Sequence, residues 1–174
     1  VETAPVAIIT GGPGTGKTTI VRALCKAYLA ANRTVLLTAP TGRAAKRLSE
    51  ATGQRATTVH RLLEWAPGEA AGFRRRADRP LEADLIVCDE ASMLDLPLAR
   101  ALIAAVPPGA TLVLVGDVDQ LPSVGPGRVL ADLIESERVP VTRLREIFRQ
   151  AEGSGIVEAA HRILGAELPQ PTPK

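Results

Sequence analysis

Aromatic side chains are scarce in this 174-residue sequence, where they make up 2% of the residues as one Trp, one Tyr and two Phe. Surfaces that bind nucleic-acid bases by stacking are built from such rings, so their scarcity argues against a stacking platform. The core must be built instead from Leu, Val, Ile and Ala, within a hydrophobic fraction of 45%. This fraction is too high for a disordered chain, and the length suits one folded domain.

Long apolar runs and cysteine patterns are also absent. No run approaches the roughly 18 apolar residues that cross a membrane, and no signal peptide is recognisable. The two cysteines, Cys25 and Cys88, have neither metal-ligand spacing nor a CxxC pair, as is typical of a reduced protein. We therefore expect a cytoplasmic protein with no membrane partner. Because the first residue is Val1 rather than Met, we also expect a piece of a longer protein.

Charge is nearly balanced, with a formal net charge of +2. The basic residues are nevertheless clustered, in one group at Arg74, Arg75, Arg76 and Arg79 and another at Arg43, Lys46 and Arg47. Such clusters are typical of a solvated surface, although they also suit a nucleic-acid backbone. Charge alone does not decide between these two interpretations.

Short apolar runs alternate along the chain with amphipathic stretches. We expect strands at residues 6–10, 34–38, 84–88, 111–115 and 139–142, and helices at residues 17–31, 42–51, 57–65, 96–106, 128–135 and 156–164. This alternation predicts an α/β fold with a mostly parallel sheet and helices on both faces. Ligands of such sheets bind at the carboxyl ends of the strands.

Residues 66–80 interrupt the alternation. This Arg-rich stretch has little periodicity and contains Pro67, Gly68, Gly72 and Pro80. We therefore expect an inserted loop or a small hairpin. The main domain is expected at residues 1–168, followed by a Pro-rich tail or linker at residues 169–174.

A glycine-rich segment follows the first predicted strand and opens the first predicted helix. It reads GGPGTGKT at residues 11–18 and matches the P-loop pattern GxxxxGK[ST]. Backbone N–H groups of such a loop surround phosphate oxygens, so the segment predicts an ATP site. Lys17 would carry the charge at the β- and γ-phosphates, and Thr18 would offer a hydroxyl to Mg²⁺. The expected nucleotide-binding residues are Gly12, Pro13, Gly14, Thr15, Gly16, Lys17, Thr18 and Thr19.

Two adjacent carboxylates follow the strand predicted at residues 84–88. Mg²⁺ prefers oxygen ligands and keeps several waters, so Asp89 would hold the ion through a water. Glu90 would polarise the attacking water as a general base. Two acids after a strand could equally solvate a turn, but together with the P-loop they favour catalysis.

The polar segment at residues 116–122 follows the next predicted strand. An amide there, such as Gln120, could hydrogen-bond the γ-phosphate or the attacking water. Spacing alone does not distinguish such a sensor from an ordinary polar loop.

Six segments, taken in order, resemble motifs I, Ia, Ib, II, III and IV of superfamily-1 helicases. They read GGPGTGKT at 11–18, TAPTGRAA at 38–45, TTVHRLL at 57–63, DEAS at 89–92, VGDVDQLPSVGPG at 115–127 and FRQ at 148–150. The amino-acid sequences of the second, third and fifth segments are most similar to those of the RecD/TraA branch of DNA helicases. The resemblance covers nearly the whole chain and implies a RecA-like P-loop NTPase domain, the first motor domain of a 5′→3′ helicase.

The resemblance implies further roles at matching positions. Gln120 would sense the γ-phosphate, and Arg149 would neutralise charge on the transferred phosphoryl group. Single-stranded DNA would contact Pro40, Thr41, Gly42, Arg43, Thr58 and His60. The insertion at residues 66–80 occupies the place of the small 1B hairpin that meets the duplex junction, where Arg74, Arg75 and Arg76 would contact DNA. With so few aromatic residues, phosphate contacts should dominate.

The sequence also departs from the family pattern. No glutamine precedes the P-loop to recognise adenine, and motifs V and VI of a second motor domain are absent. The second motor domain, and other helicase or nuclease subunits, are therefore expected partners supplied from elsewhere. Two other classes stay open, a small-molecule P-loop kinase and a nucleotide-binding module without turnover. Neither an acceptor pocket nor an arginine-bearing lid is evident for a kinase.

Overall fold

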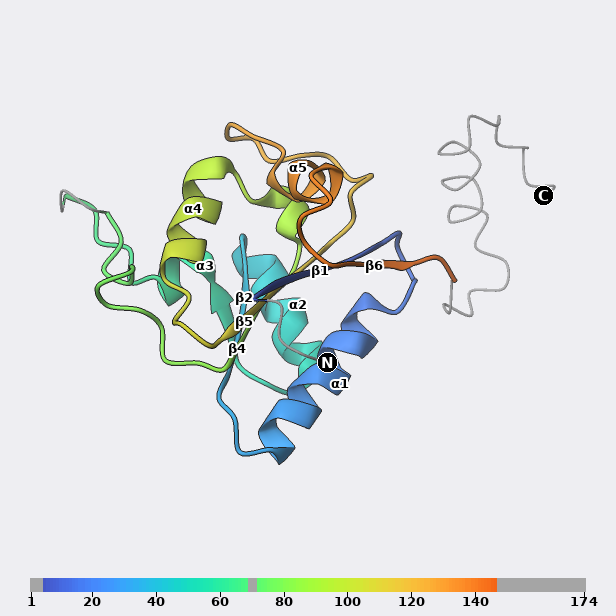
Figure 1. The fold of residues 1–174 in the computed structure, drawn as a ribbon, viewed down its shortest axis with the longest axis horizontal. Helices are drawn as coiled ribbons and strands as arrows, with labels where there is room; N and C mark the ends of the chain where they lie inside the picture. The colour runs from blue at the N-terminus through green and yellow to red at the C-terminus, as the bar shows by residue number, and fades with distance from the viewer. Residues whose placement is uncertain (1–4, 69–71, 147–174) are drawn as a thin grey trace.

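One parallel sheet organises the molecule. The structure is a computed structural model that describes residues 5–68 and 72–146. Its strands are β1 (Val6–Gly11), β2 (Val35–Ala39), β3 (Ala56–Thr58), β4 (Leu85–Cys88), β5 (Thr111–Gly116) and β6 (Val141–Leu144). They lie in the order β3-β2-β4-β5-β1-β6, and every pairing between neighbours is parallel (Figure 1). The predicted fold class is confirmed.

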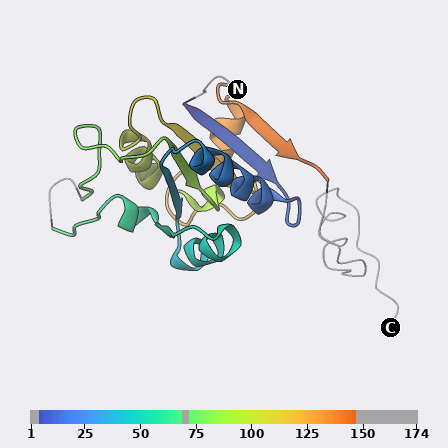
Figure 2. The same cartoon turned by 90° about the horizontal axis from the view of Figure 1, so that it is seen from below.

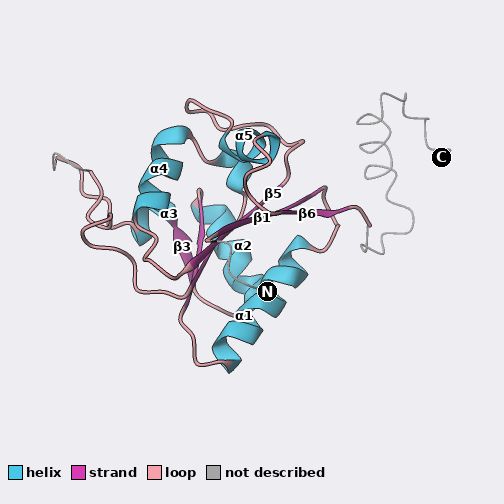
Figure 3. Cartoon of the chain, viewed as in Figure 1, coloured by secondary structure: helices cyan, strands magenta, loops and turns pink. Residues whose placement is uncertain are grey.

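Helices connect successive strands, as the parallel pairing requires. They are α1 (Lys17–Ala30), α2 (Gly42–Thr52), the one-turn α3 (Val59–Leu62), α4 (Leu96–Ala104) and α5 (Val129–Glu135), with a 3₁₀ turn, η1 (Ala91–Met93), after β4. Figure 3 shows how much of the described chain between these elements is loop, above all between α3 and β4.

The core has two layers, one on each face of the sheet. In β4, Leu85 and Val87 face one layer, while Ile86 and Cys88 face the other, because successive side chains of a strand alternate. The first layer is completed by α1 and α2, and the second by α3, α4 and α5. Figure 1 shows α4 and α5 on the opposite side of the sheet from α1, and Figure 2 views the molecule from the α1 side.

Side-chain caps fix where the helices begin. Thr41 accepts a hydrogen bond from the N–H of Ala44 at the start of α2, and Asp95 accepts one from Leu98 at the start of α4. Gly53 closes α2 in the left-handed conformation, with φ of 71°.

The third helix differs from its prediction. We expected it at residues 57–65, but Ala56–Thr58 forms strand β3, which pairs with the end of β2. Thr58 remains extended because its hydroxyl caps α3, accepting from the N–H of Arg61. The prediction was therefore wrong at the first residues, and an edge strand was missed. The helix expected at 156–164 and the tail at 169–174 lie outside the described residues.

The segment between α3 and β4 is irregular. Its described residues form two isolated antiparallel bridges, Trp65 with Phe73 and Arg76 with Arg79, in place of a regular hairpin ladder. Figures 1 and 2 both show this segment projecting from one end of the molecule. Across the described part of the chain, every helix is too short or too polar to span a bilayer.

Candidate nucleotide and nucleic-acid site

The functional segments meet at one edge of the sheet. The P-loop follows β1, the two carboxylates follow β4, and the segment with Gln120 follows β5. Pro40 and Thr41 follow β2, and His60 lies two residues beyond β3. Because all strands run the same way, their carboxyl ends share this edge, where parallel sheets bind ligands.

The P-loop is shaped by left-handed glycines and by hydrogen bonds from its own side chains. Gly14 and Gly16 have φ of 82° and 86°, a left-handed conformation that costs glycine little. The hydroxyl of Thr15 donates to Gly12 O at 2.8 Å. The ammonium of Lys17 donates to Gly11 O at 2.5 Å and to Gly12 O at 2.9 Å, so the loop wraps around its own lysine. Thr18 and Thr19 are exposed at the start of α1.

The two carboxylates are held against the end of the sheet. The N–H of Asp89 donates to Thr38 O at 2.9 Å, and its Oδ1 accepts from the N–H of Glu90 at 2.9 Å. Glu90 has φ of 53°, a left-handed conformation that is uncommon for a residue with a side chain. Such strain is frequent at functional positions.

Burial and neighbouring charges act on both acids. Burial raises the pKa of the Asp89 carboxyl, and the positive charge of Lys17 lowers that pKa in part. Burial also raises the pKa of Glu90, with a further rise from Asp89, while Lys17 and Arg47 lower it. These effects place Lys17, both carboxylates and Arg47 in one electrostatic neighbourhood. Arg47, part of a basic cluster in the sequence, was not predicted to be there.

The donor set fits a metal ion that arrives with its nucleotide. Among the described residues, no group of three or more His, Cys, Asp or Glu side chains could hold a metal ion. Mg²⁺ needs fewer protein ligands, because it keeps waters and shares phosphate oxygens. Asp89 and Thr18 are the protein oxygens predicted for it, and neither is part of a closed protein cage.

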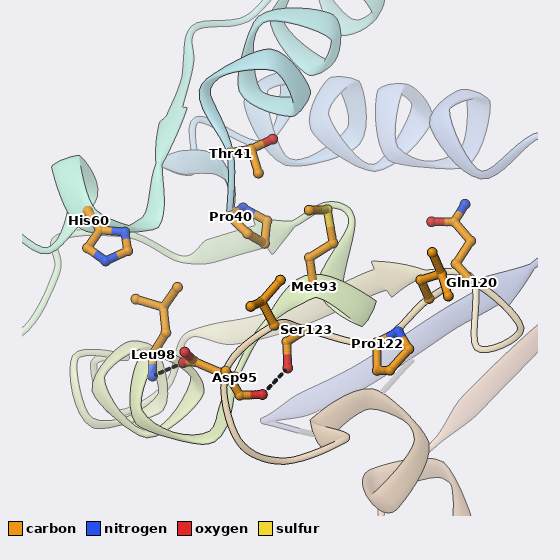
Figure 4. Close-up of a pocket in the computed structure, with 12 residues that line it drawn as sticks. Pro40, Thr41, His60, Met93, Asp95, Leu98, Gln120, Pro122 and Ser123 are labelled. Carbon is orange, nitrogen blue, oxygen red and sulfur yellow. Dashed lines mark hydrogen bonds between the residues drawn. The ribbon is translucent and has the colours of Figure 1, made fainter.

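A cavity of about 690 Å³ lies beside this edge, within the range of ligand-binding pockets. Its walls are largely apolar, from Pro40, Met93, Leu98, Leu121, Pro122 and Val124, and its polar residues are Thr41, His60, Asp95, Gln120 and Ser123. Figure 4 shows His60 and Gln120 at opposite ends of this group, with Pro40 between them. The cavity thus brings together predicted DNA contacts from motifs Ia and Ib with the predicted sensor. Gln120 is itself exposed.

Two of the predicted DNA contacts have structural partners. The hydroxyls of Thr41 and Thr58 accept helix-capping hydrogen bonds, both at 3.2 Å. The first N–H groups of a helix have no partner within it, so those of Gly42 and Arg43 remain donors at the start of α2. Both residues are exposed.

Two of the four aromatic residues, Trp65 and Phe73, lie together with His60 at the base of the insertion. Trp65 and Phe73 have ring centroids 4.8 Å apart, and His60 lies 5.7 Å from Phe73 and 6.1 Å from Trp65. Gly72 lets Trp65 approach, since a Cβ at that position would lie 2.4 Å from the indole. This cluster ties the base of the insertion to α3, an arrangement that composition did not reveal.

The arginines of the insertion differ in their surroundings. Arg75 is half-buried, and its guanidinium pairs with Glu64 at 2.7 Å and with Glu82 at 3.5 Å. Its hydrogen bond lowers the pKa of Glu64. Arg76 is exposed and pairs with Asp78 at 2.6 Å, and Arg74 is exposed.

Two predicted residues remain, Gln120, which lies in the turn after β5, and Arg149. Asp117, at the end of β5, is buried, and its Oδ1 accepts from the N–H of Asp119 at 3.0 Å. It therefore orders the turn that carries Gln120, a role that its place after a buried strand could have indicated. Arg149 lies outside the described residues.

Comparisons with known proteins agree with this arrangement. The sequence profile of the AAA domain family matches residues 1–126. The chain is 46% identical over 162 residues to the ATP-dependent RecD2 DNA helicase of Deinococcus radiodurans, and the match covers 93% of this chain and 22% of that protein. It is 42% identical over 184 residues to the RecBCD enzyme subunit RecD of Mycolicibacterium smegmatis, covering 92% of this chain and 33% of that protein.

A solved structure extends the likeness to the fold. The Pif1 helicase from Candida albicans superimposes with a TM-score of 0.66 at 24% identity, over 95% of this chain and 42% of that one. The chain spans between about a fifth and a third of the length of these curated relatives. From its P-loop and the match of the family profile, we conclude that the chain belongs to the AAA domain family, and over more than 90% of its length it is similar to RecD2 and RecD proteins.

Proposed function

We propose that this chain is the ATP-binding first motor domain of a 5′→3′ DNA helicase, which couples Mg-ATP hydrolysis to movement on single-stranded DNA. The observation that carries the proposal is the meeting of Lys17, Asp89 and Glu90 at the edge that also borders the cavity of motifs Ia, Ib and III. The 5′→3′ direction rests on the family resemblance alone.

In this proposal, each residue at the phosphate site has a separate task. Lys17 exchanges its bonds to Gly11 O and Gly12 O for phosphate oxygens, which makes stronger, charge-assisted hydrogen bonds. Thr18 and Asp89 would hold Mg²⁺, which when bound neutralises phosphate charge. Glu90 would take the proton of the attacking water. Burial and Asp89 raise the pKa of Glu90, which favours proton acceptance, and Lys17 and Arg47 partly offset that rise.

The DNA strand is proposed to cross the large cavity. The N–H groups of Gly42 and Arg43 suit backbone phosphates, as helix N-termini do in other nucleic-acid complexes. Pro40 and His60 would contact the sugar and base of the strand. Gln120 lines the same cavity and follows the turn ordered by Asp117, so it could report nucleotide state to the DNA site.

Further partners belong to the full-length protein. A second motor domain would face this edge, and Arg149 would supply charge to the transferred phosphoryl group, since such cations stabilise its transition state. One relative is named as a subunit of the RecBCD enzyme, which supports a search for associated helicase or nuclease subunits.

Strand separation by the full-length protein tests the proposal. Duplexes with a 5′ single-stranded tail should be unwound in the presence of Mg-ATP, whereas duplexes with a 3′ tail should not. A kinase would unwind neither, and its ATP turnover would depend on a small-molecule acceptor. Unwinding from the 3′ tail would reverse the assigned direction, and no unwinding at all would remove the helicase assignment.

A further inference from the structure

A second cavity lies between the insertion and α4. Its volume is about 280 Å³, and its lining includes Phe73, Arg75 and Arg76 from the insertion and Pro97, Arg100 and Ala101 from α4. Among the described residues, none of those lining it is acidic. Three guanidinium groups therefore share one small cavity with an apolar wall.

The three arginines are not equivalent. Arg75 is held by Glu64, Glu82 and the Pro80 carbonyl, so it is fixed in place and its charge is largely compensated. Arg76 pairs with Asp78 in an exposed ion pair, which contributes little and can be exchanged for another anion.

Arg100 lies on the exposed side of α4 and forms no ion pair within residues 5–68 and 72–146. Arg100 therefore gives the cavity a positive charge, and Arg76 can add to it by exchanging Asp78 for another anion.

The second cavity adjoins the proposed DNA path. On α4, Leu98 lines the large cavity, while Pro97 and Arg100 line the small one. On the other wall, His60 lines the large cavity and Phe73 the small one, with ring centroids 5.7 Å apart. The base of the insertion therefore lies between the two cavities, so a second DNA segment joined to the strand in the large cavity would reach the small one.

We propose that this cavity, on the side of the insertion away from the large cavity, binds a backbone phosphate of DNA. Arg100 and Arg76 would hold that phosphate. The inference rests on the helicase function proposed above. The cavity is smaller than the roughly 300–1,000 Å³ of pockets that enclose a small molecule, so it suits one phosphate and sugar of a longer ligand. Guanidinium forks match phosphate geometry, and the apolar wall suits the sugar.

Binding by the full-length protein tests the inference, using Arg100→Ala against wild type and three DNAs. These are a single strand, a duplex with a 5′ tail, and a fork with both tails. Affinity for the fork should fall about threefold or more, whereas affinity for the single strand should not change. The slope of log affinity against log salt should fall by about 0.9 for a duplex phosphate or about 0.7 for a single-strand phosphate.

Further substrates and variants make the result decisive. A loss on both duplex-containing DNAs would assign the phosphate to the duplex, and a loss on the fork alone would assign it to the displaced strand. Arg100→Lys should retain most of the affinity, and Arg138→Ala, which removes the same charge from the loop before β6, should match wild type. Unchanged fork binding by Arg100→Ala, or an equal loss on the single strand, would overturn the inference. Failure of the wild-type protein to bind any of these DNAs would instead count against the helicase proposal.

Discussion

Lys17 begins α1 after the P-loop that follows β1, Asp89 follows β4, and the charge of Lys17 acts on Asp89. The two strands β1 and β4 are separated in the sheet only by β5. Burial raises the pKa of Asp89, and Lys17 partly offsets that rise. Lys17 also donates hydrogen bonds to the carbonyls of Gly11 and Gly12. The pair thus links the phosphate loop to the predicted metal ligand across the sheet.

Replacing Lys17 with Ala should weaken nucleotide binding. The substitution removes a charge-assisted hydrogen bond to phosphate, so the affinity should fall by roughly 1.5–3 kcal/mol. Titration calorimetry with Mg-ATP measures this loss, and Lys26→Ala, at an exposed position on the same helix, serves as the control. Equal affinities for Lys17→Ala and wild type would remove the P-loop assignment.

Glu90→Gln should separate binding from turnover. The amide keeps the size of the side chain but cannot accept a proton, so hydrolysis by the full-length protein should fall by about 10²–10⁴, while Mg-ATP binding persists. Steady-state phosphate release measures turnover. Glu50→Gln, on the exposed side of α2, should leave it unchanged. If Glu90→Gln turns over at the wild-type rate, another residue is the base.

Thr41→Ala should destabilise the fold as well as the DNA site. Its hydroxyl caps α2, and loss of such a cap typically costs about 0.5–2 kcal/mol. Urea unfolding of the 174-residue chain measures the cost, and Thr41→Ser should restore both the stability and DNA binding. An Ala variant as stable as wild type but deficient in DNA binding would show a direct contact with DNA instead.

The base of the insertion should respond to acid. The pKa of Glu64 is lowered by its hydrogen bond from Arg75, so this pair stabilises the folded state above the ordinary value of 4.5 and is lost as pH falls below it. Trp65 is the only tryptophan of the sequence and packs against Phe73 at this base, so its fluorescence reports the change. Far-UV circular dichroism in parallel separates local opening from global unfolding.

A matched variant checks the cause of that response. Glu64→Gln lacks the titrating group, so its Trp65 signal at neutral pH should already resemble that of wild type below the transition. It should then change little on acidification. An identical acid transition in the variant and in wild type would show that another group controls this segment.

The sequence was sufficient to predict five of the six strands of the sheet. The runs of β-branched and other apolar residues that form β1, β4 and β5 are largely buried. A strand that is buried on both faces has a continuous apolar sequence, and that pattern predicts a strand of a parallel sheet. The P-loop and the acids after β4 needed only spacing within short segments. By contrast, β3 was missed because its three residues also suit a helix cap, and only pairing with β2 makes them a strand.

Contacts between segments far apart in the chain could not be predicted. Arg47 acts on Glu90 from α2, and Arg100 faces Arg76 across a cavity between α4 and the insertion. The pairing of Arg75 with Glu64 and Glu82 was equally hidden, so the sequence assigned to DNA an arginine that also closes the base of the insertion. Each of these contacts depends on how two elements pack against each other.

ATP turnover by the full-length protein, measured with and without single-stranded DNA, tests the central claim most directly. The assignment of this chain as a helicase motor domain predicts slow turnover without DNA and a large stimulation by single-stranded DNA. Raising the salt concentration should reduce the stimulation, because the proposed DNA contacts are largely to phosphates. Turnover that is the same with and without DNA would contradict the account.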